Sequence, residues 1–364
     1  MRKMKFWSIV SLLSLCFASS IAGKTDTILI LHTNDIHDHV RPDYDGVGGL
    51  PYVSGYIRQM KSERKDVLVL DAGDVAEKGD MVAFATHSEM TYEALARIGY
   101  HAGAPGNHEH DFVGIPGLKK FESLAGGMKM LCINLIDENK RPRFDPSAIF
   151  DIDGVRVGVI GMIVSRKENC LDKHETAVAM AREAERLEPL TDLIVASCHF
   201  GSSDCADISR VAPNIDVFVS GHSHEVLRHH MRVPETGAVI VQAGSYAEYV
   251  GRLEIVLDMD SEKMIEVNSE LVPMDHDTIP VDGPMLQWIR IKEKELTPEA
   301  SRIIASSDVM IGPAQVGQLA ATALREYGNS DVGFCAADQV IRAGLPIGRL
   351  DVNAFFRTGG ERGY

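Results

Sequence analysis

The sequence predicts an α/β protein, and two patterns in it support that prediction. First, short apolar runs stop abruptly at polar residues, as in the run that begins at Ile28 and ends before Asp35. Such runs are typical of strands buried in a sheet that is covered on both faces. Second, most of these runs are separated by segments whose apolar residues recur at helical spacing, such as 50–63. This alternation of strands and helices is typical of α/β folds.

The composition fits an ordinary globular protein with a substantial core. The chain has 364 residues, a hydrophobic content of 45% and a net charge of −15, which allows one large domain with a fragment or two medium domains. Binding to a nucleic-acid polymer requires basic patches, so this charge argues against such a partner. An acidic protein that acts on an anionic substrate needs local positive charge, which bound metal ions can supply.

The first residues have the pattern of an export signal. Basic residues within 2–5 are followed by an apolar run at 6–17, which is too short to span a membrane, and by a small-x-small cleavage site at 20–22. We therefore expect residues 1–22 to be a signal peptide and the mature protein to be exported, to the periplasm or out of the cell. Cys16 leaves a lipoprotein anchor open. No later segment is expected to be transmembrane.

Local signals place the elements along the rest of the chain. Thr86 and Glu89 have the spacing of a capping box, so a helix is predicted from there to Gly99. Asp153-Gly154 between two apolar runs is a strong hairpin signal. After the strand that begins at Ile28, strands are predicted at 67–70, 130–135, 148–152, 155–160, 193–197, 216–220, 238–242 and 252–257, and helices at 50–63, 86–98, 174–187, 285–296 and 316–327.

Polar residues that can bind metals follow five of the strand-like runs. Because strand ends in an open α/β sheet converge on one edge, these side chains are expected to meet. They offer imidazole, carboxylate and amide donors without a thiolate, a set that suits Mn, Zn, Fe or Co. Their number exceeds what one ion needs, and a shared carboxylate would let two ions lie about 3.5–4 Å apart. The candidates are Asp35, His37, Asp74, Asn107, His199, His222 and His224.

Each of these signals alone also has an ordinary structural explanation. The Asp35-x-His37 pattern after a strand is a turn or a cap in most proteins. Asp74 follows a strand and a glycine, as turn residues do. A lone histidine after a strand is more often a structural residue than a ligand. Five strand ends that each carry a donor are hard to explain as turn chemistry, so we predict a metal site.

Five motifs in one order give the sequence its family resemblance. HTNDIHDH, LDAGD, GNHEHD, CHFG and GHSH stand between about 27 and 257, and with them the chain resembles the calcineurin-like metallophosphoesterases, in particular the exported 5'-nucleotidases. The resemblance implies a four-layer α/β/β/α sandwich with the site at one sheet edge, followed by a partial second domain. The expected divisions are a catalytic domain at 25–272, a linker with a helix at 273–307, and the opening portion of the nucleotide-binding domain at 308–364.

The resemblance also implies a role for each ligand. Two cations would bind phosphate oxygens and lower the pKa of a water that attacks phosphorus. His108 would be the non-ligand histidine that stabilises the transition state or protonates the leaving oxygen. Asp111 is expected to contact its ring and to favour the imidazolium form. By position, Asp35, His37 and His224 would hold one ion, Asn107, His199 and His222 the other, and Asp74 would bridge them, with Asn107 also contacting the substrate.

Two departures from the family pattern bear on the substrate. His110 replaces an aromatic residue and is expected to point away from the site. Arg342 stands where the family has a substrate-binding arginine, but Gln339, Val340 and Ile341 replace the glycines that normally precede it. The leading hypothesis is an exported two-metal phosphoesterase that acts on a small phosphate ester, with nucleotides favoured. A 2',3'-cyclic-nucleotide phosphodiesterase, a sulfur-ester hydrolase of the same superfamily and a non-catalytic exported binding protein remain open.

Overall fold

The computed structural model describes residues 24–359, apart from residues 78, 165, 166, 168 and 262. The signal peptide expected at 1–22 lies outside the described residues. Within the part of the chain that the structure describes, no helix is both long enough and apolar enough to cross a membrane.

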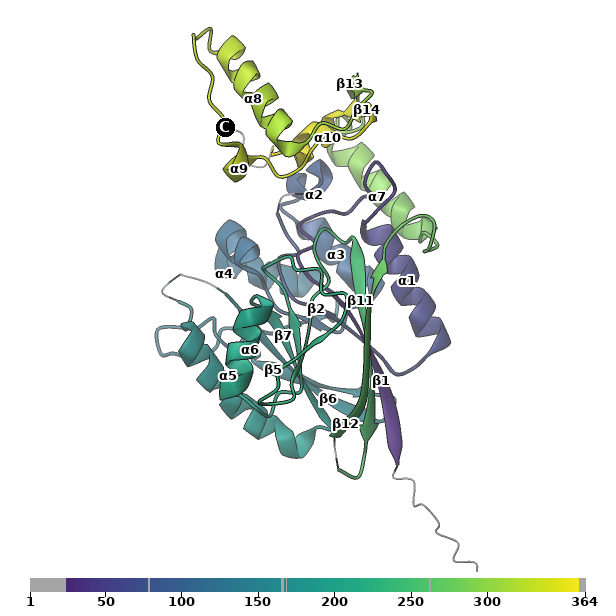
Figure 1. Cartoon of the computed structure of the whole chain (residues 1–364), viewed down its shortest axis with the longest axis vertical. Coiled ribbons are helices and arrows are strands. Elements are labelled where there is room, and N and C mark those ends of the chain that lie inside the picture. Colours follow the sequence, from purple (N-terminus) through teal and green to yellow (C-terminus); the bar gives the residue numbers. More distant parts are fainter. Residues whose placement is uncertain (1–23, 78, 165–166, 168, 262, 360–364) are drawn as a thin grey trace, which may run out of the picture.

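Two mixed sheets of six strands form the centre of the described structure (Figure 1). In the first sheet β1 to β4 run parallel, β11 pairs antiparallel with β1, and β12 pairs antiparallel with β11. Its order is β12 (Lys263–Pro273), β11 (Tyr249–Asp258), β1 (Thr25–Thr33), β2 (Val67–Asp71), β3 (Ala102–Gly103) and β4 (Lys129–Met130).

The second sheet has a parallel centre with an antiparallel strand at each edge. Its first two strands form the predicted hairpin, and both turn residues, Asp153 and Gly154, have positive φ, as a tight hairpin turn requires. Its order is β5 (Ser147–Ile152), β6 (Val155–Ile163), β7 (Leu193–His199), β8 (Val217–Ser220), β10 (Val239–Val241) and β9 (Met231–Arg232).

Alternate residues of the central strands face different layers, which makes the fold four layers thick. On β1, Ile28 and Ile30 pack against the second sheet, whereas Leu29 and Leu31 pack against helices. Both faces of the strand are buried, which is why its sequence is continuously apolar. The predicted α/β/β/α sandwich is confirmed. The first sheet is covered by α1 (Leu50–Glu63), α3 (Glu89–Ile98) and α4 (Asn107–Leu124), and the second by α5 (Lys173–Leu187) and α6 (Ser202–Val211). A short 3-10 helix, η1 (Glu188–Leu190), follows α5.

One predicted strand, at 130–135, is largely wrong. Only its first residue belongs to β4. Beyond Met130 the chain leaves the first sheet and approaches the second. There Ile133 N donates a hydrogen bond to Gly161 O of β6 at 2.8 Å. The Asn134 side chain then holds both backbone groups of Ile163, at 2.6 and 3.0 Å. Apolar sequence alone did not distinguish a strand from a segment buried between two sheets.

The C-terminal part, residues 297–359, packs on the end of the sandwich near α2 (Met81–Ala85) and α7 (Gly283–Leu296) (Figure 1). Part of the segment expected as a linker is instead a strand, β13, paired with β14. A small apolar cluster around Leu345 and Leu350 receives Tyr44 from the sandwich. The elements of this part are β13 (Ile303–Ser307), α8 (Pro313–Tyr327), α9 (Ala337–Val340), β14 (Gly348–Asp351) and α10 (Val352–Arg357).

Candidate metal centre

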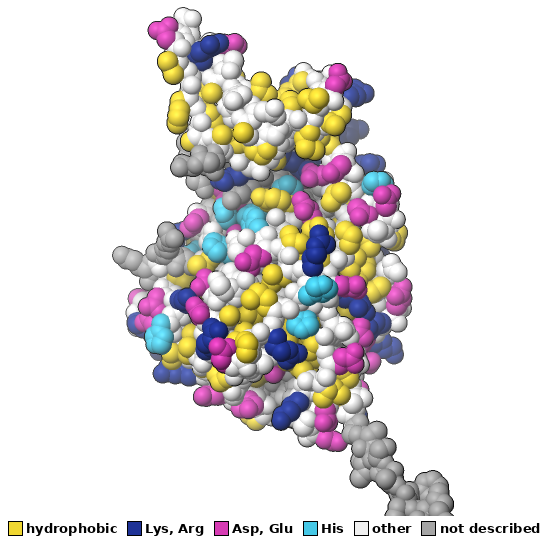
Figure 2. All heavy atoms as spheres, in the orientation of Figure 1, with side chains coloured by type: hydrophobic (Ala, Val, Ile, Leu, Met, Phe, Trp, Pro, Cys, Tyr) yellow, Lys and Arg dark blue, Asp and Glu magenta, His cyan; other side chains and the backbone are white. Residues whose placement is uncertain are grey.

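The predicted ligands lie at the carboxyl ends of strands from both sheets. Asp35 and His37 follow β1, Asp74 follows β2, and His199 ends β7. The remaining candidates begin α4 or follow β8. Figure 2 shows histidine side chains gathered where the C-terminal part meets the sandwich. The convergence expected from strand direction therefore occurs, with the two sheets contributing to one centre.

Asp35, His37 and His224 form the first group of possible ligands. Their ligand atoms all lie within 4.8 Å of one another. The two histidine Nε2 atoms are 3.2 Å apart, and Asp35 Oδ1 lies 3.3 Å from His224 Nε2. Donors that bind one zinc tetrahedrally at 2.0–2.2 Å are about 3.4 Å apart. The three side chains therefore have the spacing that one divalent ion requires.

Asp74, His199 and His222 form the second group, again with ligand atoms within 4.8 Å of one another. His199 Nε2 lies 3.0 Å from Asp74 Oδ2. Asn107 Oδ1 is also buried, and it has no hydrogen-bond partner among the described residues. His199 Nε2 is buried too, with the Asp74 carboxylate as its neighbour. A buried polar atom left unpaired is costly, and both atoms are ordinary ligands of a borderline metal. The residues present thus fit a second ion.

Asp74 lies between the two groups. Its Oδ2 is 3.0 Å from His199 Nε2 and 3.8 Å from His37 Nε2. Its Oδ1 accepts a hydrogen bond from the His108 backbone N at 2.9 Å. A carboxylate in this position can contact both ions, which is the arrangement expected for a bridging ligand.

Residues 28–226, more than half of the chain, match the calcineurin-like phosphoesterase family. This chain belongs to that family. Membership supports a metal-dependent phosphoester hydrolase, and confirms the resemblance drawn from the five motifs.

The names of two relatives of this phosphoesterase are those of an endonuclease and a 5'-nucleotidase. It is 24% identical over 352 residues to endonuclease YhcR of Bacillus subtilis, covering 83% of this chain and 28% of that protein. It is 27% identical over 332 residues to a 5'-nucleotidase of Vibrio cholerae, covering 79% of this chain and 56% of that protein. The chain thus spans only part of the length of these relatives: 28% of the Bacillus subtilis protein and 56% of the Vibrio cholerae protein. The structure of a 5'-nucleotidase precursor from Thermus thermophilus superposes with a TM-score of 0.76 at 22% identity, covering 92% of this chain and 74% of that one.

Most of the candidate ligands have a left-handed backbone conformation, which orients their side chains. Asp35 and His37, which follow β1, both have φ near +50°. Such conformations are uncommon outside glycine and cluster at functional sites. They turn the chain sharply just past a strand end, so that neighbouring side chains can reach one centre. The five ligands with positive φ are Asp35, His37, Asp74, His222 and His224.

Two glycines let the ligand loops approach each other. A Cβ on Gly106 would lie 2.0 Å from Asp74 Oδ1, and one on Gly73 would lie 2.8 Å from His199 Nδ1. Gly73 also has a φ of +86°, which favours glycine. These positions require glycine because a side chain would displace the Asp74 carboxylate or the His199 ring.

Backbone carbonyls orient two of the ligand histidines. His199 Nδ1 donates to Ala72 O at 2.7 Å, and His37 Nδ1 faces Ala76 O at 3.3 Å. A proton on Nδ1 leaves Nε2 free to bind a metal. Both rings therefore present Nε2 toward the centre.

The charges of the second group depend on one another. Burial raises the pKa of Asp74, but His199 and the other nearby histidines outweigh it and hold that pKa well below its ordinary value. Burial lowers the pKa of His199, but Asp74 and Asp35 raise it to about 10. Without metal, His199 is therefore protonated at neutral pH. Metal binding must displace this proton.

Glu109, which was not among the predicted site residues, joins two loops that carry candidate ligands. It is fully buried. Its Oε1 accepts from Val75 N at 2.5 Å and Ala76 N at 3.0 Å, and its Oε2 accepts from Gly106 N at 2.9 Å. This carboxylate holds the loop after β2 against the start of α4. Its place within the GNHEHD motif was the available signal.

The expected pairing of His108 with Asp111 is corrected by the structure. The carboxylate on the His108 ring is that of Glu77, whose Oε2 lies 2.5 Å from Nδ1. Asp111 is 54% exposed and forms an ion pair with Lys167 at 2.8 Å. Three residues along a helix move Asp111 to the surface, whereas the loop after β2 carries Glu77 inward. Nothing in the sequence pattern distinguished these outcomes.

The two residues that depart from the family pattern, His110 and Arg342, contact other parts of the chain. His110 Nε2 contacts Asn169 Nδ2 at 3.3 Å. Arg342 is exposed, and no hydrogen bond or ion pair joins its side chain to another described residue. Its backbone N donates to Thr358 O at 2.9 Å.

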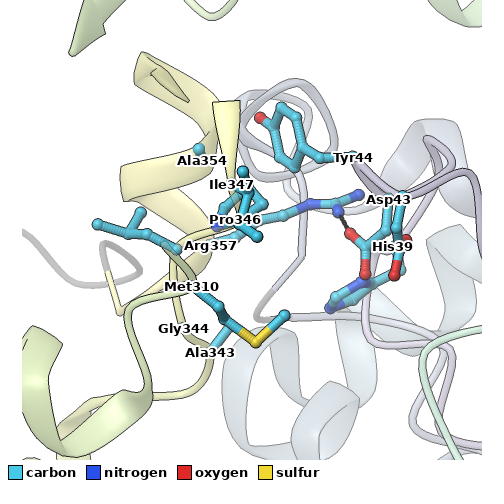
Figure 3. Close-up of a pocket in the computed structure, with 12 residues that line it drawn as sticks. His39, Asp43, Tyr44, Met310, Ala343, Gly344, Pro346, Ile347, Ala354 and Arg357 are labelled. Atoms are coloured by element: carbon cyan, nitrogen blue, oxygen red, sulfur yellow. Dashed lines mark ion pairs between the residues drawn. The ribbon is translucent and has the colours of Figure 1, made fainter. Parts of the chain in front are cut away.

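A cavity of about 430 Å³ lies between the loop after β1 and the C-terminal part (Figure 3). His39 and Tyr44 come from the loop, residues 343–347 form the opposite wall, and Arg357 reaches across to an ion pair with Asp43. The His39 ring stacks on Tyr246 with centroids 4.4 Å apart, and the Tyr246 and His37 centroids are 5.8 Å apart. One aromatic ring therefore links the wall of this cavity to the metal ligands.

Proposed function

We propose that this phosphoesterase hydrolyses phosphate monoesters of small molecules, with nucleotides as the favoured substrates, using two divalent ions. The observation that carries the proposal is that Asp74 lies between two groups of candidate ligands, while Asn107 Oδ1 is buried without a hydrogen-bond partner among the described residues. The donor set suits Mn, Zn, Fe or Co.

Each residue would have a distinct task. Asp35, His37 and His224 would hold one ion, Asn107, His199 and His222 the other, and Asp74 both. When bound, the ions supply positive charge to the phosphate oxygens and lower the pKa of a water. His108 would protonate the leaving oxygen, since its Nε2 lies 4.0 Å from Asp74 Oδ2 and is directed at the centre.

The preference for nucleotides rests on relatives and on position. The 5'-nucleotidase of Vibrio cholerae supports it. Arg342 stays a predicted substrate-binding residue, and its neighbour Ala343 lines the cavity beside the centre. Asn107 stays a predicted contact to the substrate. Export through a signal peptide at 1–22, to the periplasm or outside the cell, belongs to the same proposal.

A phosphodiester substrate is the second candidate, favoured by the similarity to endonuclease YhcR. The net charge of −15 argues against a nucleic-acid polymer. Cyclic nucleotides carry less charge and would meet less repulsion.

A metal analysis combined with a substrate panel tests the proposal. We expect about two ions per chain, hydrolysis of AMP and p-nitrophenyl phosphate, loss of activity with a chelator, and recovery with Mn or Zn. Bis-p-nitrophenyl phosphate, 2',3'-cyclic AMP, a thiosulfate ester and single-stranded DNA form the other arms. Faster turnover of a diester or a sulfur ester would replace the monoester assignment. If two ions bind but no substrate is hydrolysed, the result would instead support a non-catalytic binding protein.

A further inference from the structure

Glu77 is a buried carboxylate held in an uncommon backbone conformation. It lies three residues after Asp74, is 2% exposed and has a φ of +71°. Burying a carboxylate is costly unless it is hydrogen-bonded or paired, and a left-handed conformation adds to that cost for a residue with a side chain. Both costs persist only where the surroundings enforce them. Among the described residues, the carboxylate contacts the His108 ring, with Oε2 2.5 Å from Nδ1.

Asp38 enforces the position of Glu77. Its Oδ2 accepts from the Glu77 backbone N at 2.8 Å and from Ser88 Oγ at 2.6 Å, and its Oδ1 accepts from Thr91 Oγ1 at 2.5 Å. Asp38 is itself buried. Because Ser88 and Thr91 lie at the start of α3, the loop that carries Glu77 is attached to a helix rather than only to its own strand.

The other end of the same loop is attached to Asp38 as well. Asp80 N donates to Asp38 O at 2.9 Å. A Cβ on Gly79 would lie 2.1 Å from the Asp38 carbonyl carbon, so the two chain segments are in close contact. The loop is therefore held on both sides of Glu77.

This geometry constrains the His108 ring. An ionised carboxylate can only accept hydrogen bonds, so Nδ1 must carry a proton where Glu77 contacts it. Nε2 then faces Asp74 and the metal ligands, at 4.0 Å from Asp74 Oδ2. A carboxylate behind a catalytic histidine fixes both the tautomer and the orientation of its ring.

We propose that Glu77, and not Asp111, is the positioning residue for His108. This inference rests on the proposed function. In the reaction, a water oxygen forms the new bond to phosphorus and the ester P–O bond breaks, leaving its electron pair on the leaving oxygen. That oxygen takes the proton from His108 Nε2, and the proton released by the water restores His108. Glu77 keeps Nε2 directed at the leaving oxygen throughout.

The kinetic consequence depends on the leaving group. A nucleoside alkoxide requires protonation, whereas p-nitrophenolate leaves without it. Outer partners of site histidines are worth about 10- to 100-fold, so Glu77→Gln should lower kcat for AMP by about that factor with little change in KM. The loss with p-nitrophenyl phosphate should be no more than about threefold, because general acid catalysis contributes little there.

A double-mutant cycle separates positioning from a structural role. Glu77→Ala should lower kcat for AMP in the wild type but change it less than about twofold in a His108→Ala background. Full metal content by mass spectrometry should accompany each value. Glu122→Ala, which removes an exposed carboxylate from the same helix as His108, is the surface control. Additive losses in the cycle, or a loss in Asp111→Asn larger than in Glu77→Gln, would overturn the proposal.

A measurement without turnover keeps the test independent of the substrate. The measurement is an NMR spectrum of zinc-loaded protein labelled with 15N-histidine. The signal of the His108 ring is assigned as the one that disappears in His108→Ala. We expect a proton on Nδ1 in the wild type and its loss in Glu77→Ala. Glu77→Gln, which keeps the size of the side chain, covers the case in which the alanine variant does not fold. An unprotonated Nδ1 in the wild type would refute the pairing, whereas inactivity toward every ester would refute only the proposed function.

Discussion

Replacing Arg357 with alanine should detach the C-terminal part from the sandwich. The guanidinium is 5% exposed, and its Nε and Nη2 donate to Asp80 at 2.8 and 2.9 Å. Nη2 also donates to Arg41 O at 3.1 Å. Removing one partner of a buried ion pair costs about 3–5 kcal/mol, because the other charge stays buried without its partner.

The lower end of that range applies here. Asp80 keeps two donors after the substitution, Arg41 N at 2.8 Å and Asn353 Nδ2 at 2.7 Å. We therefore expect Arg357→Ala to lower the free energy of unfolding by about 3 kcal/mol. With a urea dependence of about 3 kcal/mol per M, the midpoint should fall by about 1 M.

Trp288 on α7, next to the C-terminal part, can report this unfolding by fluorescence. Arg349→Ala, on the exposed start of β14, is the matched control. Adding Asp80→Asn to Arg357→Ala should restore part of the loss, since no buried charge is then left unpaired. A midpoint in Arg357→Ala within about 0.2 M of the control would refute the assignment of this ion pair as a main attachment.

Three further predictions concern the metal centre. Asp74→Ala should lose metal, whereas His108→Ala should keep about two ions and lose about 10²–10⁴-fold in kcat; equal metal loss in both would contradict the assigned roles. Gly106→Ala should also lose metal, because its Cβ would meet Asp74 Oδ1 at 2.0 Å, while Gly283→Ala, with no atom within 4 Å of its Cβ, should keep it. The pKa of His199 is raised in the folded protein from 6.5 to about 10, so it stabilises the metal-free protein fully below pH 6.5 and less as pH rises toward 10. Urea midpoints of the metal-free protein between pH 6.5 and 10 test this prediction. If the contribution of His199 to stability increased with pH, the prediction would be wrong.

Much of the arrangement of the candidate metal ligands could be predicted from the sequence. Strand direction determines which ends meet, so donors after β1, β2, β7 and β8 were expected to converge, and they do. The apolar runs also indicated strands buried on both faces, which the packing of β1 between helices and the second sheet confirms. These features depend on periodicity and chain direction. Both can be inferred from the pattern of apolar and polar residues within short segments.

Only the tertiary structure decided which side chains pair within that centre. Asp111 was the expected partner of His108 because it is close in sequence, but the contact belongs to Glu77, 31 positions away. Likewise, the segment after Met130 left its sheet, and a strand formed where a linker was expected. Left-handed turns at positions such as Asp35 and Glu77 redirect side chains at the strand ends. Such turns are enforced by contacts from distant residues such as Asp38 and Glu109, so local sequence patterns do not reveal them.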